Sequence, residues 1–188
     1  MNLDSAKLRE IEELFGQKPE SPVRDVPMWQ NELFEQLKEE EGLRNETYTP
    51  TRGDVPTIGY GHTGEYAKPG AYISDKEAEG ILKKDIQVRE KPIKKLLPEF
   101  DVYPTELQVP LASSYFRGSL GGSPKTVQLI NERKYSEAAD EFLDNDEYRN
   151  AKARGRAGIR PRMERTSNAL RKFGTGQHPS NNLIPGTN

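Results

Sequence analysis

Three consecutive glutamates, Glu39, Glu40 and Glu41, are the residues whose type and position best suit acid–base chemistry. Apolar residues at intervals of four predict an amphipathic helix from Met28 to Gly42, and the glutamates form its last turn. Glu39 falls away from the apolar face, whereas Glu40 and Glu41 fall near its edge. A carboxyl group at such an edge is partly desolvated, which favours the protonated form that a general acid needs. Periodicity does not separate Glu40 from Glu41, and a solvated acidic helix end is the alternative interpretation.

The segment after this helix changes to a strand-like composition. Between Glu46 and Tyr60, the residues Thr, Tyr, Val and Ile alternate with Pro and Gly, which predicts a β-hairpin or a small sheet. Residues 57–63 read Thr-Ile-Gly-Tyr-Gly-His-Thr. Gly59 and Gly61 permit positive φ angles and a close approach of the backbone to a ligand.

The order of these residues closely resembles the signature of phage-type lysozymes, the muramidase endolysins. The matching residues are Glu-Gly-Leu-Arg at 41–44, then Tyr48, Gly53 and the block at 57–63. The similarity extends over residues 28–173. It implies an α+β, mainly helical, lysozyme-like fold, in which a substrate cleft separates a small β-hairpin or sheet lobe from a larger helical lobe. It also implies an N-acetylmuramidase that cleaves the β-1,4 bond between N-acetylmuramic acid and N-acetylglucosamine in peptidoglycan, without a cofactor.

The resemblance also implies roles for single residues. Glu41 matches the catalytic acid, and Thr57 matches the threonine that helps to hold the attacking water in a reaction that inverts configuration. The residues expected to bind the glycan are Tyr48, Gly59, Tyr60 and Arg117. His62 and Asp85 are expected to form a structural ion pair.

One position departs from the family's pattern. The hairpin of the family carries Tyr-x-Asp-x-x-Gly, and counting from Tyr48 and Gly53 places Pro50 where the catalytic Asp belongs. Proline has no carboxylate and cannot activate water. This chain has one extra residue between Gly53 and Thr57, and Asp54 lies in the widened turn. We hypothesise that Asp54 supplies the second carboxylate; the alternative is that it only stabilises the turn.

Pro50 also supports a different class of function, a catalytically lost lysozyme-like module that binds the cell wall or serves as a virion structural protein. The presence of Glu41, Thr57 and Asp54 counts against that interpretation. A third class follows from the many Arg and Lys residues between Arg149 and Lys172 in a chain of net charge −2. They predict either a surface for an acidic polymer or a solvated helix face. No nucleic-acid-binding motif accompanies them, so no nucleic acid is expected as a partner.

The composition of the chain argues against several other kinds of site and protein. The chain of 188 residues has no cysteine, which excludes disulfides and a thiol nucleophile. Its two histidines, His62 and His178, are too few and too isolated to predict a metal site. No apolar run approaches the roughly 20 residues of a membrane span, and the acidic N-terminus is not a secretory signal. We therefore expect synthesis in the host cytoplasm, action at the periplasmic cell wall and no membrane insertion.

Three parts are expected along the chain. Residues 1–27 read as an N-terminal arm with a short helix over 4–16 and a Pro-rich linker. Residues 28–173 form the lysozyme-like catalytic domain, and residues 174–188 form a flexible tail. The arm is a candidate contact for virion proteins, which would make the enzyme virion-associated. A free endolysin would be a monomer, and the sequence does not choose between the two.

Helix signals recur after the hairpin. The residues Ser-Asp-Lys-Glu at 74–77 and Thr-Glu-Leu-Gln at 105–108 both match the capping box, and Ser-Pro at 123–124 matches a helix start. Ser136 is expected to cap a further helix. Pro92 is expected to interrupt the helix that starts after Ser74.

Overall fold

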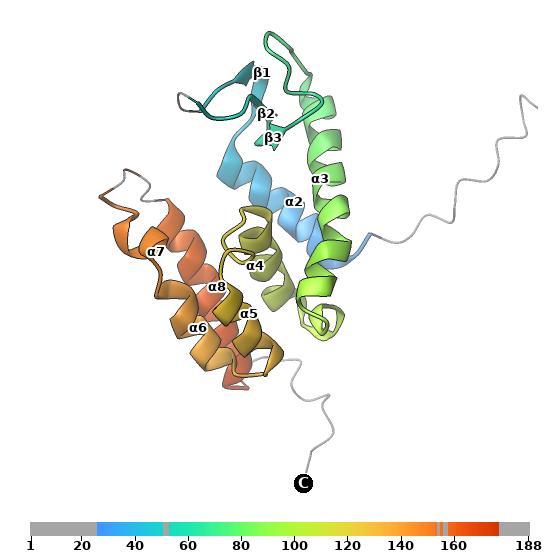
Figure 1. The fold of residues 1–188 in the computed structure, drawn as a ribbon. Helices are drawn as coiled ribbons and strands as arrows, with labels where there is room; N and C mark the ends of the chain where they lie inside the picture. The colour runs from blue at the N-terminus through green and yellow to red at the C-terminus, as the bar shows by residue number, and fades with distance from the viewer. Residues whose placement is uncertain (1–25, 51–52, 154, 156–157, 177–188) are drawn as a thin grey trace, which may run out of the picture.

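A computed structural model of the chain describes residues 26–50, 53–153, 155 and 158–176 (Figure 1). The predicted helix over 4–16 and the tail beyond Gly176 lie outside the described residues. A small sheet stands at one end of the molecule, and α2 and α3 run from it into a body built by the remaining helices (Figure 1). This is the mainly helical α+β class that the sequence predicts.

The elements follow one another with short connections. In chain order they are α2 (Met28–Glu41), β1 (Arg44–Tyr48), β2 (Thr57–Gly59), β3 (His62–Thr63), α3 (Asp75–Leu96), the 3-10 helix η1 (Phe100–Val102), α4 (Thr105–Phe116), α5 (Pro124–Asn131), α6 (Tyr135–Leu143), α7 (Asp146–Asn150) and α8 (Ile159–Gly174).

Helix α2 connects the helical body to the sheet. It buries Trp29, Leu33 and Leu37 along one face, as the spacing of four predicts. Gly42 ends it with a φ of 67°, a left-handed conformation that a glycine adopts without the steric cost of a Cβ. The chain can therefore enter β1 three residues after Glu41.

The sheet is antiparallel with the strand order β1-β2-β3. Its register pairs Tyr48 with Thr57, and Thr57 in turn with Thr63. Residue Tyr72 forms a further antiparallel bridge with Glu46, which joins the connection before α3 to the free side of β1. The predicted hairpin is thus part of a slightly larger sheet, with Thr57 on its central strand.

Helix α3 starts as the sequence predicts and ends later than it predicts. The Ser74 hydroxyl accepts from the Glu77 backbone N–H, and the Glu77 carboxylate accepts from the Ser74 N–H at 2.7 Å, which is a complete capping box. The predicted interruption at Pro92 is wrong, because the helix continues to Leu96. Ile93 and Leu97 are buried beyond the proline, and their packing outweighs the missing backbone hydrogen bond.

Of the helix starts predicted in the second half of the chain, some are confirmed and others are wrong. Helix α5 begins at Pro124, as predicted. The second capping box is absent, because the side-chain amide of Gln108 donates to the carbonyl oxygen of Phe100 at 2.8 Å and not to the start of α4. The cap predicted at Ser136 is also wrong, since α6 already begins at Tyr135. In both cases tertiary contacts decide where the local pattern leaves a choice.

Helix α8 is fixed against α4 and α6 by a buried polar seam. The hydroxyls of Ser114 and Thr166 lie 2.7 Å apart, and Thr166 donates to the carbonyl oxygen of Pro110 at 3.1 Å. Ser167 donates to the carbonyl oxygen of Ala139 at 2.9 Å. Buried hydroxyls must be satisfied, so these bonds allow little choice in the rotation of α8 about its axis. That rotation turns the arginines of α8 toward the end of α2.

Candidate active site

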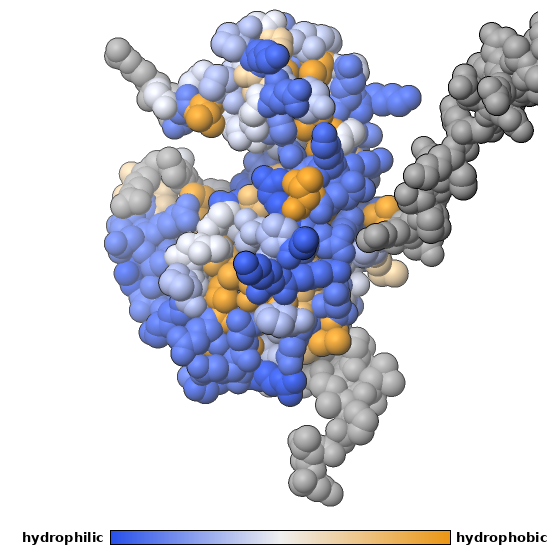
Figure 2. Space-filling model, turned by 45° about the vertical axis from the view of Figure 1, so that its right-hand side comes forward, coloured by the Kyte–Doolittle hydropathy of each residue, from blue (hydrophilic) through white to orange (hydrophobic). Residues whose placement is uncertain are grey.

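Glu41 lies at the junction of the sheet and the helical body and contacts two arginines. Its side chain keeps 25% of its surface exposed, and its Oε1 lies 2.6 Å from Nη1 of Arg117. The nearest nitrogen of Arg162 lies 3.9 Å from the same oxygen. The space-filling view shows a notch in the molecular outline between the sheet and the helical body (Figure 2). The Glu41 carboxylate is thus fixed by positive charge and still accessible to a ligand.

The neighbouring carboxylate, Glu40, is more deeply buried and contacts more arginines than Glu41 does. Its side chain is 12% exposed and forms ion pairs with Arg117 and with Arg165. Arg162 approaches it with Nε at 3.8 Å and donates from Nη2 to the backbone carbonyl of Glu40 at 2.7 Å. We call Glu40, Glu41, Arg117, Arg162 and Arg165 the arginine–glutamate cluster. It joins α2 to both α4 and α8.

Arg117 divides its guanidinium between the two glutamates. One terminal nitrogen pairs with Glu40 and the other with Glu41. Burial lowers the pKa of Arg117 from its ordinary value, and Glu41 is the strongest of the charges that oppose this effect. A guanidinium stays charged through such a shift, so Arg117 can pair with either glutamate whenever that carboxylate is ionised. The Nε of Arg117 is buried and has no hydrogen-bond partner among the residues that the structure describes.

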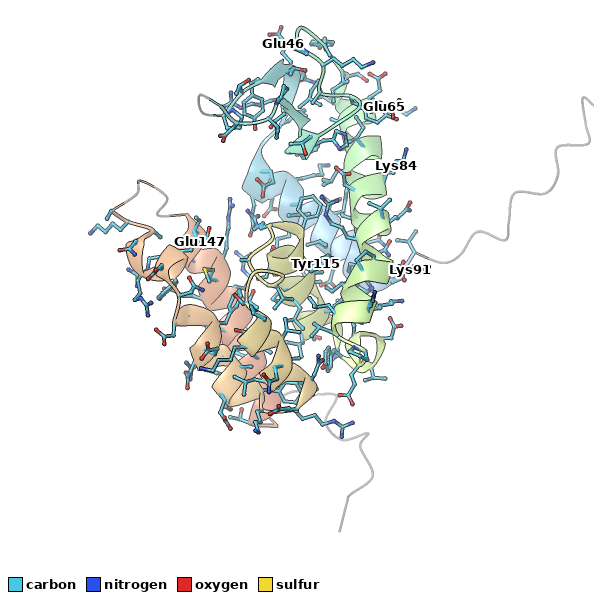
Figure 3. All side chains as sticks on the ribbon, viewed as in Figure 1. Glu46, Glu65, Lys84, Lys91, Tyr115 and Glu147 are labelled. Carbon is cyan, nitrogen blue, oxygen red and sulfur yellow. The ribbon has the colours of Figure 1, made fainter. Side chains whose placement is uncertain are left out.

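A pocket of about 210 Å³ opens beside Arg117. Its other lining residues, from α4 to α8, are Ser113, Ser114, Ser119, Glu147, Ile159, Arg162 and Met163. Glu147 of α7 is on the helical body, whereas Glu46 of β1 lies at the far end of the sheet (Figure 3). The pocket therefore belongs to the helical side of the junction.

Thr57 and Asp54 lie on the sheet side of the junction. Thr57 is 6% exposed, and its hydroxyl donates to the carbonyl oxygen of Val55 at 3.1 Å. That bond uses the only hydroxyl proton, so the oxygen can only accept a further hydrogen bond. Asp54 is exposed, in the turn between Gly53 and Val55. Pro50 is exposed on the other side of the same turn.

The glycan-binding residues expected on the sheet are placed differently from one another. Tyr48 is half-buried, with the guanidinium of Arg44 4.3 Å from its ring centre. Tyr60 is 8% exposed and belongs to the hydrophobic core. Gly59 has a φ of 63°, and a Cβ added there would lie 3.4 Å from Cδ1 of Ile73. Both of the last two residues are packed inside the domain, and their expected contacts with the glycan stay predictions.

His62 and Asp85 form a contact between the sheet and α3. Nδ1 of His62 lies 2.9 Å from Oδ2 of Asp85, which is the pairing that the resemblance implies. The other carboxylate oxygen of Asp85 lies 3.6 Å from Arg89. The contact anchors β3 on α3 and so supports the sheet from behind.

Five of the described arginines in the basic stretch from Arg149 to Lys172 pair with acids of the same domain. In addition to the cluster, Arg160 lies 3.9 Å from Glu164, and Arg171 pairs with Asp140. Arg149 pairs with the acidic residues around the start of α7. These contacts favour a network of ion pairs over an open surface for an acidic polymer.

Sequence reasoning missed the cluster around Glu40. No sequence signal distinguishes Glu40 from Glu41. The sequence also assigns no role to Arg162 or Arg165. Their spacing of three places them on one helical face, and a pair of glutamates near an apolar edge needs buried partners. Together these two patterns are the signal that points to the cluster.

Residues 26–50, 53–153, 155 and 158–176 contain neither a candidate metal site nor a candidate membrane span. This part of the chain contains no group of three acidic or histidine side chains arranged to hold a metal ion. None of its helices is long and apolar enough to cross a membrane.

Comparisons with known proteins agree on one family. The sequence model of the phage lysozyme family matches residues 38–166. The endolysin of Bacillus phage B103 is 36% identical over 111 residues, which are 57% of this chain and 41% of that protein. The endolysin of Salmonella phage P22 is 33% identical over 117 residues, again 57% of this chain and 75% of that protein. The chain thus spans less than half the length of the B103 endolysin.

The fold gives the same relationship. A crystal structure of a mutant P22 lysozyme superimposes with a TM-score of 0.53 at 26% sequence identity. The match covers 74% of this chain and 94% of the P22 protein. Helices and sheet therefore occur in the same spatial order in both.

Proposed function

Because the chain belongs to the phage lysozyme family, we propose that it hydrolyses peptidoglycan as an N-acetylmuramidase, with Glu41 as its general acid. The observation that carries the proposal is the position of Glu41. It ends α2 at the junction of sheet and helical body, and its carboxylate is held by Arg117 at 2.6 Å while 25% of its side chain stays exposed. A fixed and accessible carboxyl group is what proton transfer to a leaving oxygen requires.

In the proposed reaction, Glu41 protonates the oxygen that leaves with N-acetylglucosamine as the bond to C1 of N-acetylmuramic acid breaks. Water attacks C1 from the opposite face and passes one of its two protons to a carboxylate, so the configuration inverts. We assign that carboxylate to Asp54. An inverting pair needs roughly 6.5–9.5 Å between its carboxyl groups to leave room for the water.

Thr57 is proposed to orient the water. Its hydroxyl proton is bound to the carbonyl of Val55, so its oxygen accepts a hydrogen bond from the water and does not compete for the water's lone pair. Because the residue is 6% exposed on the central strand of the sheet, the oxygen keeps a fixed position. A fixed acceptor costs no reorganisation during the reaction.

Tyr48 and Arg117 remain proposed glycan contacts. Tyr48 presents a half-buried ring on β1, a suitable surface for a sugar ring, and Arg117 lines the pocket beside Glu41. The proposal includes no cofactor and no metal ion. It places the protein in the host cytoplasm on synthesis and at the cell wall in action.

A second candidate is a cell-wall-binding or virion structural module without activity. Pro50 favours it, because no carboxylate occupies the position of the family's catalytic Asp.

The role of residues 1–27 separates two settings for the active enzyme, a free monomeric endolysin and a virion-associated enzyme bound to virion proteins. Finding the protein in purified phage particles supports the second setting, and finding it only in lysates supports the first.

The test of the proposed function is the clearing of outer-membrane-permeabilised Gram-negative cells. Wild type should clear them and Glu41→Gln should not. Glu39→Gln is the matched control, since Glu39 is exposed on the same helical turn and the change removes the same charge. Wild-type protein that binds walls without clearing them would instead support the inactive module.

A further inference from the structure

The arginine–glutamate cluster contains more positive than negative charge, and that balance bears on Glu41. Three guanidinium groups face two carboxylates. A general acid must carry its proton when the substrate is bound. Nearby positive charge favours the ionised form of a carboxyl group, so uncompensated arginines around Glu41 would work against its role.

Glu40 is the residue that compensates this charge. It pairs with Arg117 and Arg165 and approaches Arg162, and with 12% exposure its carboxylate is screened from solvent. Arg117 is the arginine nearest to Glu41, and one half of its guanidinium is bound to Glu40. Each positive charge that Glu40 binds is one that acts less strongly on Glu41.

We propose that Glu40 is a positioning residue that keeps Glu41 competent as a proton donor by occupying the arginines that surround it. The inference rests on the proposed role of Glu41. It assigns to Glu40 no contact with the substrate. Its effect is transmitted through Arg117 and Arg162, which contact both glutamates.

The charged groups that face the pair come from three helices. Arg117 is the C-cap residue directly after α4, and Arg162 and Arg165 belong to α8. Glu147 of α7 lines the pocket that Arg117 and Arg162 share, so it adds a more distant negative charge. Arg165 differs from the other two arginines, because it pairs with Glu40 and not with Glu41 among the ion pairs of the described residues.

This asymmetry gives two variants with opposite expected effects. Glu40→Gln removes a negative charge and leaves the arginines to act on Glu41 alone, so Glu41 should lose its proton at lower pH. Arg165→Gln removes a positive charge that only Glu40 binds, so Glu40 becomes more available to Arg117 and Glu41 should keep its proton to higher pH. Both variants break the ion pair between Glu40 and Arg165, so the loss of that pair alone would affect them alike.

The experiment is the pH dependence of kcat/KM on purified peptidoglycan for wild type, Glu40→Gln, Arg165→Gln and Glu40→Asp. The alkaline limb of the profile should move down by about one pH unit in Glu40→Gln and up by a smaller amount in Arg165→Gln. Glu40→Asp retains the charge and should restore the wild-type limb. Thermal unfolding of each variant provides the measure of structural damage.

The outcomes separate this inference from the proposed function. Profiles that differ in height but keep the same alkaline limb, or limbs that move in the same direction, would overturn the role of Glu40. Hydrolysis by Glu41→Gln under the same conditions would instead overturn the proposed acid, whatever the other profiles show.

Discussion

The two sides of the junction are built in different ways. On the helical side, Glu41 is held by an ion-pair cluster that involves α2, α4 and α8. On the sheet side, Asp54 lies exposed in a turn, and Thr57, three positions later, is buried. The proposed acid is thus held by contacts from several elements, whereas the proposed second carboxylate depends on one turn. A chain can change residues in such a turn without disturbing its core, and here the departure from the family pattern falls in that turn.

The largest effect is expected from Glu41→Gln on the fixed side. The amide retains the shape but cannot donate the proton, so activity should fall by about 10²–10⁴-fold. Initial rates of cell clearing measure the loss. Glu39→Gln should retain the wild-type rate. Equal losses in both variants would show that the charge of the helix end matters and not the acid.

Asp54→Asn tests the open side. If Asp54 accepts the water's proton, activity should fall by about 10²-fold or more, while the turn retains its fold. A wild-type rate would assign Asp54 to turn stability alone. The matched rescue is Pro50→Asp in the Asp54→Asn background, which returns a carboxylate to the position the family uses. Recovery of hydrolysis in the double variant would show that the two positions serve the same reaction.

Thr57→Val tests the residue that is proposed to orient the attacking water. Valine fills the same volume without a hydroxyl, so the fixed acceptor for water is lost and kcat should fall by roughly tenfold with little change in KM. The lost hydrogen bond to Val55 should lower stability by about 1 kcal/mol. Steady-state kinetics and chemical denaturation separate the two effects. A rise in KM at constant kcat would contradict water positioning.

The smallest effect on activity is expected from a change at the start of α3, the helix that packs against the sheet. Ser74→Ala removes the cap of α3 and should lower Tm by roughly 2–4 °C without changing the rate of hydrolysis. The hydrogen bonds from the Ser74 hydroxyl and then from its backbone N–H lower the pKa of Glu77 below its ordinary value of 4.5. A lowered pKa stabilises the fold above the ordinary value, and this contribution disappears as the pH falls through the lowered one. The Tm difference between wild type and Ser74→Ala should therefore become smaller in acid without disappearing, because the hydrogen bond from the Glu77 backbone N–H to the Ser74 hydroxyl does not titrate.

The sequence predicts much of the fold, because local signals and packing agree in most elements. The apolar spacing of α2 and the capping box at Ser74 both lead to the observed helices. The errors occur where a tertiary contact competes with the local pattern. Gln108 binds the carbonyl of Phe100 and not the start of its own helix, and burial of Ile93 carries α3 past Pro92. Neither contact can be seen in the local sequence.

The candidate site was predictable to a smaller extent. Glu41 and Thr57 follow from the resemblance to the family, as does the contact of His62 with Asp85. The grouping of Glu40 with Arg165 depends on the rotation of α8, which buried hydroxyls of that helix set. Burial of Tyr60 depends likewise on how the sheet meets α3. Such features are properties of packing between distant segments.

The most direct test of the central claim is mass spectrometry of the fragments that wild type and Glu41→Gln release from purified peptidoglycan. If Glu41 is the general acid of a muramidase, wild type should release muropeptides with N-acetylmuramic acid at their reducing ends, and Glu41→Gln should release none. Fragments that end in reducing N-acetylglucosamine, or the same muropeptides released by Glu41→Gln, would contradict it.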